Sequence, residues 1–159
     1  MASKDKRRFD ERVPVNSEPF WFSSAIITSA DVTDDLVMKH FPADQGSFLV
    51  LHAGVEIIEA FNGSASLVVG VGTMPTKLLG TVTAVDADQF LISTDVTEAT
   101  IGYYPAVGSA EAIALGIGGS TVIKGADATV PVMYGVMTAT GATTGKARVH
   151  LLLTRIPLA

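Results

Sequence analysis

Residues 60–73 read AFNGSASLVVGVGT and carry the two signals that decide the fold. Asn62 and Gly63 form a strong turn signal, because both residues tolerate positive φ angles, and the pair predicts a β-hairpin. After this turn, apolar and small residues alternate with a period of two, which is typical of a β-strand. The residues expected on the apolar face are Ala65, Leu67, Val69 and Val71.

The glycines of this stretch resemble the start of a phosphate-binding loop, but the pattern is incomplete. A dinucleotide loop needs a third glycine and a following helix, whereas Gly70 and Gly72 are followed by Met74 and Pro75. The glycines at residues 116–120 have the wrong spacing, and the TTGK at residues 143–146 lacks the P-loop serine or threonine. We therefore expect turn and close-approach glycines and no nucleotide site.

The rest of the chain also consists of short strand-like segments separated by Gly, Pro, Asn and Asp. Gly54 interrupts the longest segment and predicts a bulge or a bend. Glu56 and Glu59 leave a helix open as the alternative for residues 55–61. Pro131 restricts its segment to a sheet edge or a strand start. The expected strands are residues 20–28, 35–41, 47–61, 64–73, 88–94, 99–104, 120–125, 129–138 and 147–156, with a turn or two of helix in 107–115.

This number of short strands predicts an all-β fold, a jelly-roll-like two-sheet β-sandwich, with an immunoglobulin-like sandwich as the alternative. The chain has 159 residues, enough for one domain with its own core. We expect a charged N-terminal arm over residues 1–17 and the sandwich over residues 18–159. No run of residues is long and apolar enough to predict a transmembrane helix, and the N-terminus does not read as a secretory signal.

Charge is distributed unevenly between the arm and the body. Residues 1–13 hold five basic and three acidic residues, a net charge of +2, and the remaining six basic and thirteen acidic residues give −7. An acidic body argues against nucleic-acid binding. The arm is either a solvated tail or a segment that binds a partner. Its candidate partner-binding residues are Lys4, Lys6, Arg7, Arg8, Phe9 and Arg12.

The sequence offers little for catalysis or metal binding. It contains no cysteine, and His40, His52 and His150 stand singly in separate predicted strands. The acidic residues at 31–35 and 86–89 lack the pattern of a calcium loop and are typical of turns. We therefore predict no catalytic residues, no metal and no cofactor.

Two aromatic pairs could bind sugars. Phe20 with Trp21 could form a sugar-stacking platform, although a place in the core or in a subunit interface is the preferred reading. Tyr103 and Tyr104 are the other glycan-binding candidates.

The turns and strands at residues 60–65, 67–70, 86–96 and 140–155 resemble those of small tailed-bacteriophage virion proteins with a jelly-roll-like β-sandwich. The resemblance covers about residues 49–155 and does not include the arm. It implies a head decoration, or cement, protein that is an oligomer, often a trimer, and it brings no catalytic residues.

The resemblance thus implies a non-enzymatic structural protein, made in the host cytoplasm, that stabilises the outer capsid surface. Its partners would be the major capsid protein and further copies of itself, with no membrane and no specific nucleic acid. The alternative is a tail or fibre jelly-roll module that binds a receptor or glycan. Asn62 and Gly63 are expected to be a structural turn in either case. A metal enzyme built on the histidines is the weakest hypothesis.

Overall fold

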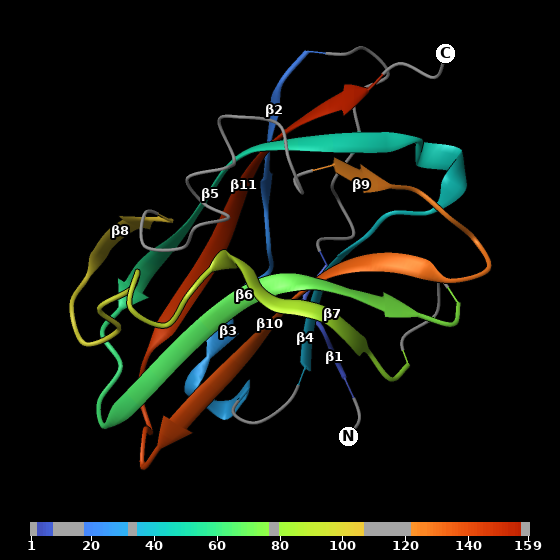
Figure 1. Cartoon of the computed structure of the whole chain (residues 1–159). Helices are drawn as coiled ribbons and strands as arrows, with labels where there is room; N and C mark the ends of the chain where they lie inside the picture. The colour runs from blue at the N-terminus through green and yellow to red at the C-terminus, as the bar shows by residue number, and fades with distance from the viewer. Residues whose placement is uncertain (1–2, 8–17, 32–34, 77–79, 107–121, 157–159) are drawn as a thin grey trace.

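The computed structural model describes residues 3–7, 18–31, 35–76, 80–106 and 122–156, and these form an all-β sandwich (Figure 1). No helix in the described ranges is long and apolar enough to cross a membrane. The five-stranded sheet, here sheet A, has the order β1 (Lys4–Asp5), β4 (Asp35–His40), β10 (Val130–Thr140), β6 (Ser64–Met74), β7 (Thr83–Leu91). Sheet B has the order β2 (Phe20–Ser23), β11 (Lys146–Ile156), β5 (Ser47–Glu59), β8 (Gly102–Pro105), with β3 (Ile27–Thr28) paired to β11 and β9 (Val122–Lys124) paired to β5.

The strand order is that of a jelly roll. Without the short strands β1, β3 and β9, the main strands alternate between the sheets as β2-β11-β5-β8 and β4-β10-β6-β7. Among the main strands of the described residues, only β6 and β7 are consecutive and paired with each other; each of the others is followed by a main strand of the opposite sheet. This interleaving is the double Greek key that the predicted sandwich requires. The jelly-roll prediction is therefore confirmed.

The core fills the space between the two sheets. The face of β6 predicted from the alternation points inward, with Leu67 and Val69 buried and Ala65 and Val71 packed against the core. A smaller buried cluster covers part of the opposite face of sheet A. Its members are Val37, Met74, Val82, Val132 and Tyr134.

Strand β5 is continuous, so the strand prediction for residues 55–59 is confirmed over the helix alternative. The bulge predicted at Gly54 is wrong, because Gly54 pairs regularly with His150 of β11. The register instead shifts at Leu51 and at Ile58, each of which is an extra residue on β5. The extra residue at Leu51 moves the core-facing positions of β5 from even-numbered to odd-numbered residues.

The hairpin predicted at Asn62-Gly63 is also wrong, because β5 and β6 lie in different sheets. The turn is instead a corner between the sheets, and Gly63 has the expected positive φ of 77°. The Asn62 side chain bonds to the neighbouring β10–β11 corner, where its Oδ1 accepts hydrogen bonds from the backbone N–H groups of Thr143 (2.7 Å) and Thr144 (2.9 Å). The two corners are therefore joined by hydrogen bonds, and the structural role of the Asn62-Gly63 turn stays a prediction.

Two further sequence predictions have different outcomes. Pro131 is the second residue of β10, a strand in the interior of sheet A, so the strand-start reading is confirmed. The short helix predicted in 107–115 lies outside the described residues. Strand β1, which pairs in parallel with β4, was not predicted.

Candidate binding face on sheet B

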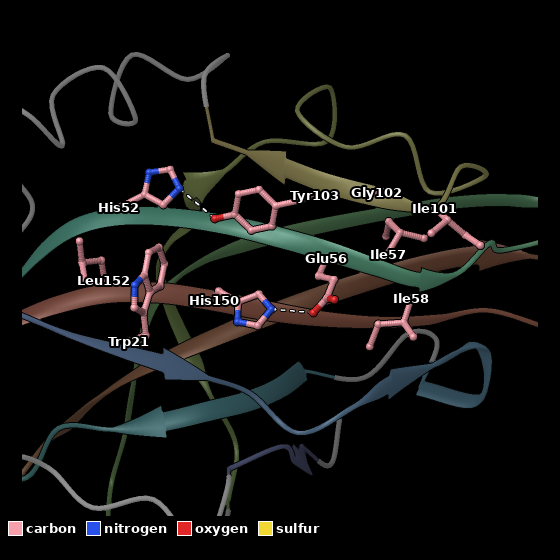
Figure 2. A pocket seen from close by; sticks show the side chains of 10 residues that line it. All are labelled: Trp21, His52, Glu56, Ile57, Ile58, Ile101, Gly102, Tyr103, His150 and Leu152. Carbon is pink, nitrogen blue, oxygen red and sulfur yellow. Dashed lines mark hydrogen bonds and ion pairs between the residues drawn. The ribbon is translucent and has the colours of Figure 1, made fainter.

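The outward face of sheet B carries a shallow pocket of about 850 Å³. Strands β2, β5, β8 and β11 supply most of its lining (Figure 2). The lining residues are Trp21, His52, Glu56, Ile57, Ile58, Ile101, Gly102, Tyr103, His150 and Leu152.

One end of the pocket is formed by Trp21, which lies on the edge strand β2. Its neighbours Phe20 and Phe22 pack toward the core, so the alternation of the strand turns the indole outward, where it is 55% exposed. The His52 ring meets the indole edge-on, with a centroid separation of 5.8 Å and an interplanar angle of 82°. Leu152 of β11 lies between them, because it pairs with Trp21 on one side and with His52 on the other. Core placement of Trp21 is therefore wrong, and because Phe20 packs inward, the two do not form a shared platform.

Tyr103 lies on β8, and its side chain packs against Gly54 of the neighbouring strand β5. A Cβ placed on Gly54 would lie 2.2 Å from the Tyr103 hydroxyl oxygen, so this position accepts the ring only because it is glycine. The hydroxyl group bonds to Nε2 of His52 at 2.9 Å (Figure 2). Partial burial raises the pKa of the Tyr103 phenol. Gly54 is thus a close-approach glycine that lets the ring lie against the strand.

A second polar pair lies beside Tyr103. Nε2 of His150 on β11 is 2.9 Å from Oε2 of Glu56 on β5, and its Nδ1 is 2.7 Å from the Ser23 hydroxyl. The Glu56 side chain remains 45% exposed. Register pairing across β11 and β5 brings these residues together although they are far apart in the sequence.

The structure brings together some of the residues singled out from the sequence and separates others. His52 and His150 share the pocket, whereas His40 lies on β4 in sheet A. Tyr104 packs against the core, and its hydroxyl donates to the Thr100 carbonyl at 3.0 Å, so only Tyr103 belongs to the pocket. Within the described residues, no group of three or more His, Cys, Asp or Glu side chains could hold a metal ion.

Glu56 was missed by the sequence reasoning as a site residue. The only available signal was that residues 52, 54 and 56 alternate along one strand and so face the same side. No sequence pattern predicted the pairing of β5 with β11, which places His150 beside Glu56.

Part of the arm contacts its own subunit. Nζ of Lys6 lies 2.7 Å from Oδ2 of the buried Asp31, and Nζ of Lys4 lies 3.6 Å from Oδ1 of the same residue. Burial alone would raise the pKa of Asp31, but the Lys6 and Thr28 hydrogen bonds and the lysine charges lower it overall. These lysines therefore help to hold β1 against the sandwich, and their pairing with a neighbouring subunit stays a prediction.

Arg7 of the arm also contacts the sandwich. Its Nη1 lies 2.7 Å from Nδ1 of His40. Burial and then the charge of Arg7 lower the pKa of His40 to about 4. The side-chain hydrogen bond from Arg7 also lowers the pKa of Asp5, against the effect of burial. Arg8, Phe9 and Arg12 lie outside the described residues.

Comparison with solved structures identifies the fold as one found in phage capsids. The chain is similar to a chain of the cyanophage Pam1 capsid asymmetric unit, with a TM-score of 0.54, 14% identity and 94% of each chain covered. It is also similar to a chain of the capsid of Ralstonia phage GP4, with a TM-score of 0.52, 18% identity, and 92% of this chain and 91% of that chain covered. No protein-family model matches the sequence. No curated protein matches it either.

Proposed function

We propose that this chain is a structural, non-enzymatic component of a tailed-phage capsid. The observation that carries the proposal is the fold shared with capsid chains of two phages over more than nine tenths of all the chains compared. A match of that extent accounts for the whole sandwich rather than for one motif. The resemblance of the turn and strand sequences to tailed-phage virion proteins supports the same role.

Within the capsid, the role we propose is that of a decoration, or cement, protein. It would bind the major capsid protein on the outer surface as a homo-oligomer, most simply a trimer, and stabilise the shell. Each contact can be weak, because symmetry repeats it over the particle and multivalency raises the overall affinity. A chain that is 48% hydrophobic and only 17% charged suits repeated subunit contacts.

The arm would add contacts to a neighbouring subunit. Since Lys4, Lys6 and Arg7 already have partners within the chain, alanine at Arg8, Phe9 and Arg12 tests this role while leaving the described contacts of the arm intact. We expect this triple variant to bind capsids more weakly at low salt, with a smaller difference at high salt, because exposed ion pairs are screened. Equal binding by the variant and the parent chain at both salt concentrations would contradict a role for these residues.

Quantitative mass spectrometry of purified virions tests the proposed function. A decoration protein should be present in copies on the order of hundreds, following the symmetry of the shell. A handful of copies would instead support the tail or fibre alternative, and absence from the particle would overturn both. Particles stripped of the chain should lose thermal stability and regain it when the purified chain is added.

Light scattering tests the oligomer separately. We expect a defined oligomer, most simply a trimer, without any ligand. A monomer at tens of micromolar would contradict a preformed trimer and leave assembly on the capsid as the remaining route.

A further inference from the structure

The pocket on sheet B combines exposed aromatic rings with a polar centre. Trp21 is 55% exposed and Tyr103 is 47% exposed. Figure 2 shows Trp21 and Leu152 at one end, Ile58 and Ile101 at the other, and the His52–Tyr103 and His150–Glu56 pairs between them. An aromatic face offers apolar area for packing, and a few placed polar groups then fix the orientation of a ligand.

The polar groups retain hydrogen-bonding capacity. A carboxylate can accept about four hydrogen bonds, and the contact of Glu56 with His150 uses only its Oε2. A wholly apolar partner would remove water from this pair without replacing its hydrogen bonds, which is unfavourable. A ligand that carries hydroxyl groups would replace that water with new donors.

The charge of the lining narrows the class of ligand. None of the ten lining residues is lysine or arginine, although Arg148 pairs in register with Glu56 just outside the lining. Phosphate and carboxylate ligands are usually held by such cations. A neutral ligand therefore fits this pocket better than an anionic one.

The pocket is also large and rigid enough for more than one sugar ring. It reaches across four adjacent strands, from β2 to β8, a distance of about 14 Å at the usual strand spacing. The side chains brace one another: His52 contacts both Trp21 and Tyr103, and Gly54 provides the space in which the Tyr103 ring lies. Such a preorganised site loses little freedom on binding.

We propose that this pocket binds a neutral oligosaccharide. Trp21 and Tyr103 pack against the C–H faces of the sugar rings, and Glu56 accepts hydrogen bonds from their hydroxyl groups. This site goes beyond the proposed capsid role and does not depend on it: copy number on the virion tests the capsid role, and sugar binding by the purified chain tests the pocket.

The chain contains a single tryptophan, Trp21, so its fluorescence reports directly on the pocket. The probes are cellopentaose, maltopentaose and chitopentaose, with a hyaluronan oligosaccharide as the anionic comparison. We expect a saturable change in emission with at least one neutral probe below about 10 mM and none with the anionic one. Glu56→Gln and Tyr103→Ala should each weaken binding roughly tenfold or more.

Two further variants complete the test. Trp21→Ala, measured by calorimetry, should abolish binding, whereas Val85→Ala, an exposed apolar position on β7, should bind as the parent chain does. The melting temperature of each variant reports whether it is folded. No response to any neutral probe, or equal binding by folded Glu56→Gln and Tyr103→Ala, would overturn the proposal. It would also be overturned if Trp21 emission changed with protein concentration but not with sugar, because the face would then be a subunit interface.

Discussion

The close packing of the Asn62-Gly63 corner against the β10–β11 corner can be tested by comparing the effect of alanine at two glycines, one in each corner. Gly63 and Gly141 both have positive φ, 77° and 70° respectively, so alanine at either position suffers the same backbone strain. They differ in their surroundings. A Cβ on Gly63 would lie 2.7 Å from the carbonyl oxygen of Thr140 and 3.1 Å from the amide nitrogen of Ala142, whereas nothing lies within 4 Å of one on Gly141.

The expected magnitudes follow from these distances. A left-handed non-glycine residue costs about 1–2 kcal/mol, and the loss of unfolded-state freedom on replacing glycine offsets about 0.4–1 kcal/mol of this. Gly141→Ala should therefore lower the free energy of unfolding by about 1.6 kcal/mol or less. Gly63→Ala adds overlap with backbone atoms that cannot rotate away, which costs about 1–3 kcal/mol more.

Thermal unfolding followed by far-ultraviolet circular dichroism tests this difference at one fixed protein concentration, because oligomerisation shifts the melting temperature. At about 2–4 °C per kcal/mol for a chain of this size, we expect Gly141→Ala to lower the melting temperature by no more than about 6 °C, and Gly63→Ala to lower it by about 2–12 °C more than that. Equal losses would refute the contact between the corners. Gly72 is not a suitable control, since its Cβ would meet the Thr83 carbonyl oxygen at 2.9 Å.

Three further predictions concern the pocket, the arm and metal. Gly54→Ala should displace the Tyr103 ring into solvent, so one phenol should titrate at a lower pH in a spectrophotometric titration than it does in the parent chain. The pKa of His40 is about 4 in the folded chain and 6.5 ordinarily, so between these pH values the unfolded chain binds a proton at His40 and the folded chain does not. Stability to urea should therefore fall as the pH drops from 6.5 toward 4, and His40→Gln should reduce that fall. The melting temperature should be unchanged by EDTA, and a fall of several degrees would contradict the absence of a metal site.

Local patterns in the sequence predicted the strands well, because alternation and turn residues act over a few neighbouring positions. The β6 segment shows this most clearly, since its predicted apolar face is the buried one. Pairing between strands could not be predicted in the same way. Asn62-Gly63 gives the turn and its positive φ, but whether the next strand joins the same sheet depends on distant partners, here β10 and β11.

The candidate site was less predictable, because it depends on the register of four strands. Trp21 and Tyr103 were separate candidates in the sequence, and only the order β2-β11-β5-β8 places them on one face. The bulge at Leu51 matters equally: Phe48 and Val50 face the core before it, and Ala53 and Val55 face the core after it. Without that shift, His52 and Glu56 would point inward.

The two outer faces of the sandwich differ in a way that folding alone does not explain. The outer face of sheet A carries a cluster of buried apolar residues that includes Met74 and Tyr134. In the pocket on sheet B, Trp21 and Ile101 remain 55% and 67% exposed. Exposed apolar area of this kind contributes little to the stability of the isolated chain, and large patches of it mark interaction sites. Because this face also holds a glycine shaped to receive Tyr103 and a histidine–carboxylate pair at its centre, its chemistry favours a ligand with both apolar faces and hydroxyl groups over a purely apolar subunit surface.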